Sequence, residues 1–322
     1  MRKGTLLSNV PMHALLSRCA ELHINSPHLM LQLFDTMVKP VFLYGCEVWD
    51  VDFGMQVHEH VEELSKTIEG RKRRPDSQEL LHKKFIRRVL GVCESTPDVV
   101  VLGEVGRLPL AFARLKHTIK YYNRLCKLPD HRLLKKAFLD NTRLADTSQS
   151  WVALFRSQIM KLGVHWENLQ PLDDGMITDL EQRYIEAWKL KLSTQSIKTQ
   201  SYLRITEPDF NMQTYLKKEK SKLRRQIFAR FRTGSHWLQV QVGRFQNMER
   251  KDRICCHCTA DEIEDEEHFL FRCEYNENIR SQHKDLFEGQ ASASLENWFQ
   301  QDNARIARFI EKCYEAQCVS PM

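Results

Sequence analysis

Apolar residues recur at helical spacing along most of the 322-residue chain. One such stretch starts at Ser26-Pro27, an N-cap followed by proline at the first helical position, and Pro40 should kink or end it. The spacing resumes over 80–89, 109–125, 151–192 and 215–231. A last amphipathic stretch carries one apolar face, formed by Leu295, Trp298, Phe299, Ile306, Phe309, Ile310 and Cys313. Convincing runs of alternating strands are missing, so the pattern predicts an all-α, mostly helical, multi-lobed chain.

Breaks in this pattern divide the chain into predicted segments. Residues 70–75 form a charged breaker stretch, and residues 193–214 are polar and contain Pro208. We therefore expect seven segments in chain order: a helical segment (1–50), a charged loop (51–79), a helical lobe (80–192), a linker (193–214), a basic helix with its lead-in (215–254), a small zinc module (255–280) and a C-terminal amphipathic helix (281–322).

The composition is that of a soluble globular protein, with 42% hydrophobic and 28% charged residues. No stretch approaches the roughly 20 apolar residues that span a bilayer. Polar residues also interrupt the N-terminal region where a signal peptide would lie. Six of the ten cysteines are scattered without paired spacing, as expected of reduced thiols: Cys19, Cys46, Cys93, Cys126, Cys313 and Cys318. We expect an intracellular protein of the cytoplasm or nucleus, with no membrane partner.

The remaining cysteines cluster near the C-terminus with metal-ligand spacing. The pattern is Cys255-x2-Cys258-x9-His268-x4-Cys273. A two-residue spacer lets a tight turn place two thiolates on one ion, and the downstream pair completes a tetrahedral set for Zn²⁺. Four protein ligands leave no position for water, so the predicted zinc is structural and no catalytic residues are expected.

Two alternatives to this assignment stay open in the sequence. Cys256 or His257 could replace a neighbour in the first ligand pair, although Cys255 with Cys258 has the better spacing. The four residues could also be ordinary reduced cysteines and a surface histidine. The acidic residues between the two ligand pairs should face away from any phosphate: Asp261, Glu262, Glu264, Asp265, Glu266 and Glu267.

The segment before the cysteines is strongly basic. Between Tyr215 and Arg253 there are twelve basic residues and three acidic ones, while the whole chain carries only +6. If 215–231 is one helix, Lys218, Lys222 and Arg225 share a face. Such a face attracts phosphate backbones, and aromatic rings could stack on unpaired bases. The predicted nucleic-acid contacts are Lys217, Lys218, Lys222, Arg224, Arg225, Arg232, His236, Trp237 and Arg244. A merely solvated basic helix face is the alternative.

Several blocks in this order resemble one protein family. They are Leu33-Phe34-Asp35-Thr36-Met37-Val38-Lys39-Pro40-Val41-Phe42-Leu43-Tyr44-Gly45-Cys46-Glu47-Val48-Trp49, Phe85-Ile86-Arg87-Arg88-Val89-Leu90-Gly91-Val92, Glu104-Val105-Gly106-Arg107-Leu108-Pro109-Leu110 and Arg232-Thr233-Gly234-Ser235-His236-Trp237-Leu238. Followed by the zinc spacing, they resemble the C-terminal, post-polymerase region of a LINE-type (non-LTR) retrotransposon reverse transcriptase. The resemblance runs from about Leu31 to about Cys273.

This resemblance implies a relative of an RNA-directed DNA polymerase without that polymerase's catalytic part. The Tyr/Phe-x-Asp-Asp motif of the family's palm does not occur, and the segment after Cys273 is too short for a nuclease domain. We therefore expect no enzyme activity and no small-molecule substrate for this chain. The favoured function is a transposable-element fragment that binds RNA or DNA with low sequence specificity. The alternatives are the thumb and tail of a full reverse transcriptase, and a helical scaffold without a nucleic-acid role.

Overall fold

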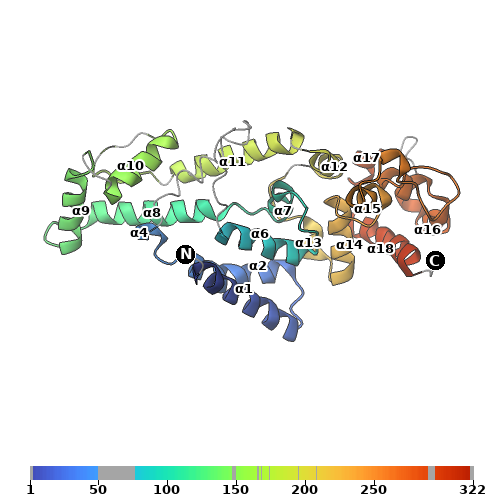
Figure 1. Ribbon diagram of the computed structural model, residues 1–322, viewed down its shortest axis with the longest axis horizontal. Coiled ribbons are helices and arrows are strands. Elements are labelled where there is room, and N and C mark those ends of the chain that lie inside the picture. The colour runs from blue at the N-terminus through green and yellow to red at the C-terminus, as the bar shows by residue number, and fades with distance from the viewer. Residues whose placement is uncertain are drawn as a thin grey trace. The chain divides into compact units, whose positions relative to one another are not determined.

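The computed structural model describes residues 3–49, 77–146, 150–164, 167, 169–173, 175–194, 196–207, 209–288 and 294–319. Helices are the regular structure in these ranges (Figure 1). The β-type pairing found there is an isolated antiparallel bridge between Ile254 and Ile263. The prediction of a mostly helical chain is therefore confirmed. The chain separates into two compact units, each assembled from stretches that are distant in sequence.

The first unit comprises Met1–Arg18, Leu33–His82 and Leu108–Lys191. Its helices are most of α1 (Lys3–Glu21), the π-helix η1 (Phe34–Val38), α3 (Lys39–Leu43), α4 (Cys46–Trp49), the start of α6 (Ser77–Leu90), α8 (Leu110–Lys127), α9 (Leu133–Arg143), α10 (Trp151–Lys161) and α11 (Gly175–Thr194). Aromatic side chains form its core. Tyr122 of α8 stacks on Phe155 of α10 with ring centroids 4.6 Å apart, and Phe112 meets Tyr184 of α11 edge-on at 5.4 Å. Figure 1 shows α8 running beside α11 in this unit.

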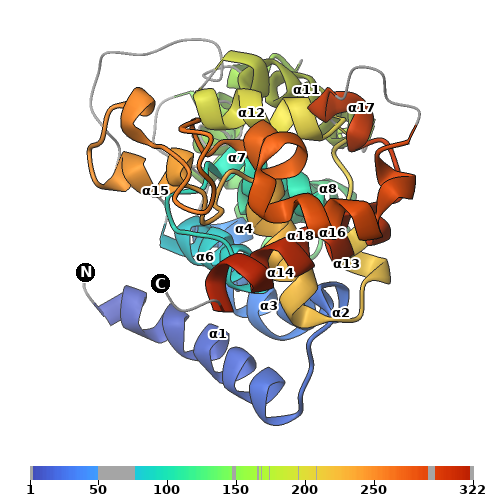
Figure 2. The same cartoon turned by 90° about the vertical axis from the view of Figure 1, so that its right-hand side faces the viewer.

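The second unit comprises Cys19–Gln32, Lys83–Arg107 and Leu192–Met322. Its helices are α2 (Pro27–Leu33), the rest of α6, α7 (Asp98–Val105), α12 (Ile197–Ile205), α13 (Thr214–Lys218), α14 (Lys222–Arg232), α15 (Gln239–Phe245), η2 (Arg250–Asp252), η3 (His268–Arg272), η4 (Glu274–Asn276), α16 (Glu277–Gln282), η5 (Lys284–Leu286), α17 (Leu295–Trp298) and α18 (Asn303–Val319). Helix α14 packs against α18, as Figure 2 shows. Phe228 and Phe231 of α14 stack on Phe299 in the core.

A buried carboxylate joins four helices of the second unit. Glu104 of α7 is 0% exposed. It accepts hydrogen bonds from the hydroxyls of Tyr202 (2.7 Å) and Tyr215 (2.8 Å), and from Nε of Arg232 (2.8 Å). Burial and the neighbouring Glu104 raise the pKa of both tyrosines well above its ordinary value, so these hydroxyls stay protonated donors. The network ties α12, α13 and α14 to α7.

The structure corrects two predicted segments. The predicted linker 193–214 contains helix α12, which begins at a capping box formed by Ser196 and Thr199. The predicted helix over 215–231 is two helices, because Glu219 to Ser221 interrupt it. The Glu219 carboxylate accepts from the Ser221 backbone N–H, and the Ser221 hydroxyl caps α14 by accepting from the Arg224 backbone N–H. Local side-chain capping has therefore overridden the continuous apolar spacing.

Other segment boundaries also differ from the sequence-based division. Residues 83–107 belong to the second unit, although periodicity grouped them with the lobe 80–192. Most of the predicted charged loop 51–79 lies outside the described residues, and its last three residues begin α6. Among the helices of the described residues, none combines the length and apolar character needed to cross a membrane.

Candidate metal centre and basic surface

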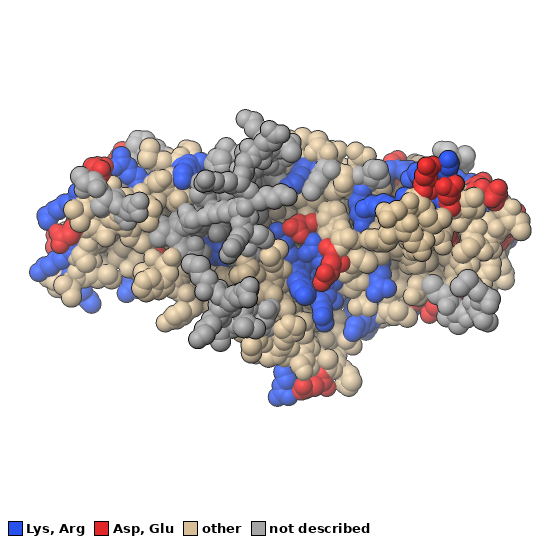
Figure 3. Space-filling view, in the orientation of Figure 1, with Lys and Arg blue, Asp and Glu red and all other residues tan. Residues whose placement is uncertain are grey.

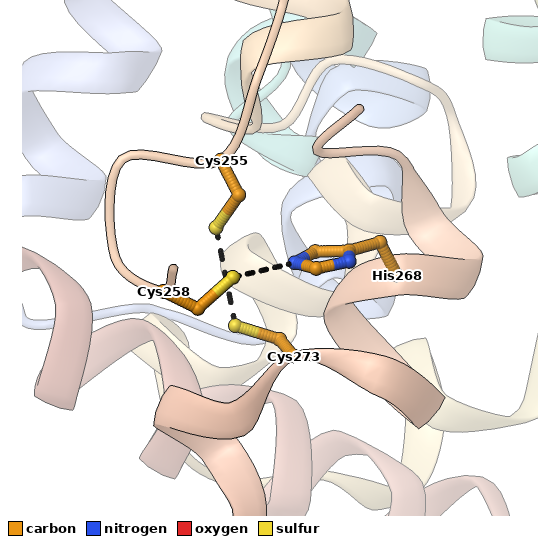
Figure 4. Close-up of side chains that lie close together, drawn as sticks. All are labelled: Cys255, Cys258, His268 and Cys273. Atoms are coloured by element: carbon orange, nitrogen blue, oxygen red, sulfur yellow. Dashed lines mark hydrogen bonds between the residues drawn. The ribbon is translucent and has the colours of Figure 1, made fainter. Parts of the chain in front are cut away.

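The four predicted ligands converge in the second unit. Figure 4 shows the sulfurs of Cys255, Cys258 and Cys273 and the ring of His268 facing one another. The Cys255 and Cys273 sulfurs are 3.9 Å apart, and the Cys258 sulfur is 3.3 Å from Nε2 of His268. Tetrahedral zinc with bonds of about 2.0 to 2.3 Å places such ligands roughly 3.5 to 3.8 Å apart. The observed separations bracket this range, so the cluster could hold a metal ion.

Local backbone structure brings the two ligand pairs together. The Cys255 backbone N–H donates to the Glu262 carbonyl (2.9 Å), beside the bridge between Ile254 and Ile263, and this pairing closes the loop that carries the first two cysteines. The second pair flanks the π-helical turn η3. There the Cys273 backbone N–H donates to the His268 carbonyl (2.7 Å), a bond between residues five apart that brings their side chains to one side.

A carboxylate orients the histidine ligand. Glu262 lies 3.0 Å from Nδ1 of His268 and accepts from Nε of Arg272 (2.8 Å). A proton on Nδ1 shared with this carboxylate leaves the Nε2 lone pair directed at the cluster, which is the arrangement typical of metal-bound histidines. The contacts with His268 and Arg272 lower the pKa of Glu262, so it stays ionised.

The cysteine sulfurs are chemically suited to a cation. Contact with Cys273, together with burial, raises the pKa of the Cys255 thiol well above its ordinary value, while the same contact lowers the pKa of Cys273. The pair therefore holds one proton more readily than two, and a divalent cation can take that proton's place. Cys255, His268 and Cys273 are buried, and Cys258 is half-buried. A set of three cysteines and one histidine fits a closed tetrahedral zinc site.

The two alternative ligands lie outside the cluster. Cys256 is exposed, and His257 packs its ring near Tyr275 at a centroid distance of 5.4 Å. Neither contributes a ligand atom to the group formed by the four predicted residues. The geometry therefore favours Cys255 with Cys258 as the first pair, the choice that the two-residue spacer indicated.

Several of the acidic residues between the ligand pairs support the cluster from outside. Glu264 is 2% exposed and accepts from the Gln239 backbone N–H (2.8 Å), and Asp265 accepts from the His268 backbone N–H (3.0 Å). Glu266 pairs with His236 at 3.0 Å. Sequence reasoning treated this stretch only as a negative loop. The signal that it overlooked is that four consecutive acids, Glu264 to Glu267, directly precede the predicted ligand His268.

The predicted nucleic-acid contacts fall into two groups. Lys217, Lys218, Lys222 and Arg244 are exposed, and none of these four forms an ion pair within the described part of the chain. On the face drawn in Figure 3, lysine and arginine side chains gather, with acidic side chains among them, in the region where Figure 1 labels α6.

The other predicted contacts are committed to the interior or to partners. Arg225 is 5% exposed and donates to the backbone carbonyls of Glu219, Lys220 and Asn25. Arg232 is buried against Glu104. The remaining three are His236, buried against Glu266; Arg224, held between Glu219 and Glu311; and Trp237, whose indole N–H donates to Gln317.

The shared basic face proposed for Lys218, Lys222 and Arg225 is therefore wrong. The first residue lies on α13 and the other two on α14, and Arg225 points inward. The physical reason is that a guanidinium can satisfy several backbone carbonyls at once, which makes it an efficient clamp for chain segments that approach from different parts of the sequence.

Comparisons of the chain with protein-family models, curated proteins and solved structures found no match. The resemblance to the LINE-type reverse transcriptase region thus rests on the sequence motifs alone and stays a prediction.

Proposed function

We propose that this chain is a non-catalytic nucleic-acid-binding module whose C-terminal part is stabilised by a structural zinc ion. The observation that carries the proposal is the coincidence, in one unit, of a closed cluster of four zinc-type ligands with the exposed cations Lys217, Lys218, Lys222 and Arg244. The cluster supplies a rigid support, and the cations supply attraction for phosphate.

The metal is assigned to zinc from the chemistry of its donors. Thiolate sulfur and imidazole nitrogen in a tetrahedral arrangement are typical of Zn²⁺, whereas Mg²⁺ and Ca²⁺ prefer oxygen ligands. Three thiolates and one neutral imidazole fill the coordination sphere. The ion would therefore hold residues 255–273 together and would not activate a water molecule.

Low sequence specificity follows from the kind of residue that is exposed. Lysines contact phosphates as point charges, and a phosphate contact carries no information about the base. Among the predicted contacts, the ring side chains of His236 and Trp237 are held by partners inside the unit. Binding through Lys217, Lys218 and Lys222 would therefore depend on charge and respond strongly to salt.

We further propose that the chain derives from a retrotransposon reverse transcriptase of the LINE type. The order of its motifs and the zinc spacing that follows them support this origin. Mapping of the transcript upstream of Met1 tests it: a continuous reading frame encoding a polymerase palm would make the chain the thumb and tail of a full enzyme.

Nucleic-acid binding is tested by fluorescence anisotropy of labelled single-stranded RNA and DNA across a salt series. The test variant changes Lys217, Lys218 and Lys222 together to glutamine. Each phosphate contact on a single strand contributes about 0.7 to the slope of log affinity against log salt. Loss of three contacts should therefore reduce that slope by roughly 2.

The matched control removes the same charge elsewhere in the second unit. Lys284, Arg308 and Lys312 are exposed residues outside the basic segment, and they are also changed to glutamine. We expect this control to keep nearly the wild-type slope. An equal reduction of the slope in both triple variants would mean that binding depends only on the net charge of the protein. Binding that does not respond to salt would reject the proposal.

A further inference from the structure

A second group of metal-type ligands lies in the first unit. Cys46 and Glu47 of α4 and His117 of α8 each place one ligand atom within 4.8 Å of the other two. The cysteine is buried, the glutamate is half-buried and the histidine is exposed. Glu47 and His117 are far apart in sequence and come together because α4 packs against α8.

The donor atoms form a mixed set that suits a borderline cation. A thiolate, a carboxylate oxygen and an imidazole nitrogen together favour Zn²⁺ or a similar first-row transition metal over Mg²⁺ or Ca²⁺, which take oxygen ligands. Ligands of one tetrahedral zinc ion lie roughly 3.3 to 3.6 Å apart for these atom types. Side-chain rotation that closes the present separations by about 1 Å would bring all three onto one ion.

The backbone around α4 is well fixed. The Trp151 indole N–H donates to the Glu47 carbonyl (3.0 Å), and the Trp151 ring packs edge-on against Tyr121, one turn beyond His117 on α8. The turn before α4 requires glycine. Gly45 has a φ of +66°, and a Cβ there would come within 2.8 Å of the Trp49 ring.

We propose that Cys46, Glu47 and His117 form a second metal site, one that binds a zinc-type divalent cation with three protein ligands. Three ligands leave a coordination position for water. The exposed side of His117 opens this position to solvent, so the ion exchanges readily. The site differs in this respect from the closed four-ligand cluster, and it does not depend on nucleic-acid binding.

Metal titration of the full chain tests the proposal. Co²⁺ replaces zinc as a visible probe, because thiolate-to-cobalt charge transfer and the d–d bands report sulfur ligands and tetrahedral geometry. We expect wild-type protein to bind two ions, with the second released first when a chelator is added. His117→Ala should bind only the tightly held ion. Because losing an outer-shell partner alone weakens metal binding by roughly 10- to 100-fold, losing a direct ligand should weaken it at least as much.

Two further variants separate a metal site from a general effect. Cys46→Ser keeps the size of a buried side chain and should also lose the second ion, together with its share of the charge-transfer band. His131→Ala changes another exposed histidine of the first unit and should keep both ions. A wild-type stoichiometry of one ion would overturn the proposal, as would a second ion that persists in both His117→Ala and Cys46→Ser.

Discussion

Replacing Glu104 with glutamine should strongly destabilise the second unit. The substitution keeps the shape of the side chain but removes its charge. In the native structure the Glu104 and Arg232 side chains are 0% and 3% exposed, and the carboxylate accepts three hydrogen bonds. In the native structure Glu104 raises the pKa of Arg232 against the opposing effect of burial. The guanidinium stays charged in the variant as well, because an arginine side chain is effectively always protonated in a protein.

The expected loss of stability follows from the Arg232 charge, which stays buried without its partner. Removing one partner of a buried ion pair typically costs about 3 to 5 kcal/mol, because the remaining charge is buried without compensation. The hydroxyls of Tyr202 and Tyr215 also exchange a charged acceptor for a neutral one, and such bonds differ by about 1 kcal/mol each. These weaker hydrogen bonds are included in the cost of removing the partner, so we expect Glu104→Gln to lower the free energy of unfolding of this unit by about 4 kcal/mol.

Urea unfolding of the chain in buffer that contains Zn²⁺, followed by tryptophan fluorescence, measures this loss. Glu94→Gln is the matched control, since the Glu94 side chain is 86% exposed and should change stability by no more than about 0.5 kcal/mol. Adding Arg232→Met to Glu104→Gln removes the unpaired buried charge of Arg232. This second change should restore at least about 2 kcal/mol of the free energy of unfolding. A Glu104→Gln variant within about 1 kcal/mol of wild type, or a double variant that recovers nothing, would refute this reasoning.

Three further predictions concern the proposed metal centre and the ion pairs of Asp98 in the second unit. Cys273→Ser should lose bound zinc to a mild chelator and speed amide hydrogen exchange over 254–273; retained zinc with unchanged exchange would contradict a structural role for the metal. Glu262→Ala should weaken zinc binding by roughly 10- to 100-fold, measured by chelator competition. Asp261→Asn removes the same charge from the same loop and should leave the affinity within about threefold, so equal losses in the two variants would exclude orientation of His268 as the cause. For Asp98, burial opposes ionisation, but ion pairs with Lys83 and Arg87 prevail and lower the pKa below its ordinary value. The stability that these ion pairs contribute is therefore fully present above the pKa of about 3.9 that Asp98 has in the unfolded chain. It is lost as the pH falls through the lower pKa that Asp98 has in the folded protein. Asp98→Asn should cost less than about 1 kcal/mol near neutral pH, since the side chain is half-exposed, and the difference from wild type should vanish in acid; a gap that widens below pH 4 would contradict the assignment.

Local spacing was sufficient to predict the Cys/His cluster that could hold a metal ion. All four of its residues lie between 255 and 273, where a tight turn and a single helical turn decide which side chains meet. Periodicity was similarly sufficient for a long helix such as α8, because its apolar residues repeat over several turns. The single amphipathic helix predicted at the C-terminus is instead divided into α17 and α18. It failed at Glu219 to Ser221, where the Glu219 carboxylate accepts from the Ser221 backbone N–H and the Ser221 hydroxyl caps the start of α14.

The sequence by itself determined the helical class and the composition of the Cys/His cluster, because both depend on neighbours within a few turns. Only the tertiary structure decided which basic residues are available to a ligand. Arg232 meets Glu104 from 128 residues away, and Arg225 reaches the Asn25 carbonyl from 200 residues away. Cys46 and Glu47 likewise lie close to His117 only because the tertiary structure brings distant parts of the sequence together. Burial of a charge depends on a partner from elsewhere in the chain, and local sequence patterns do not show which residue that partner is.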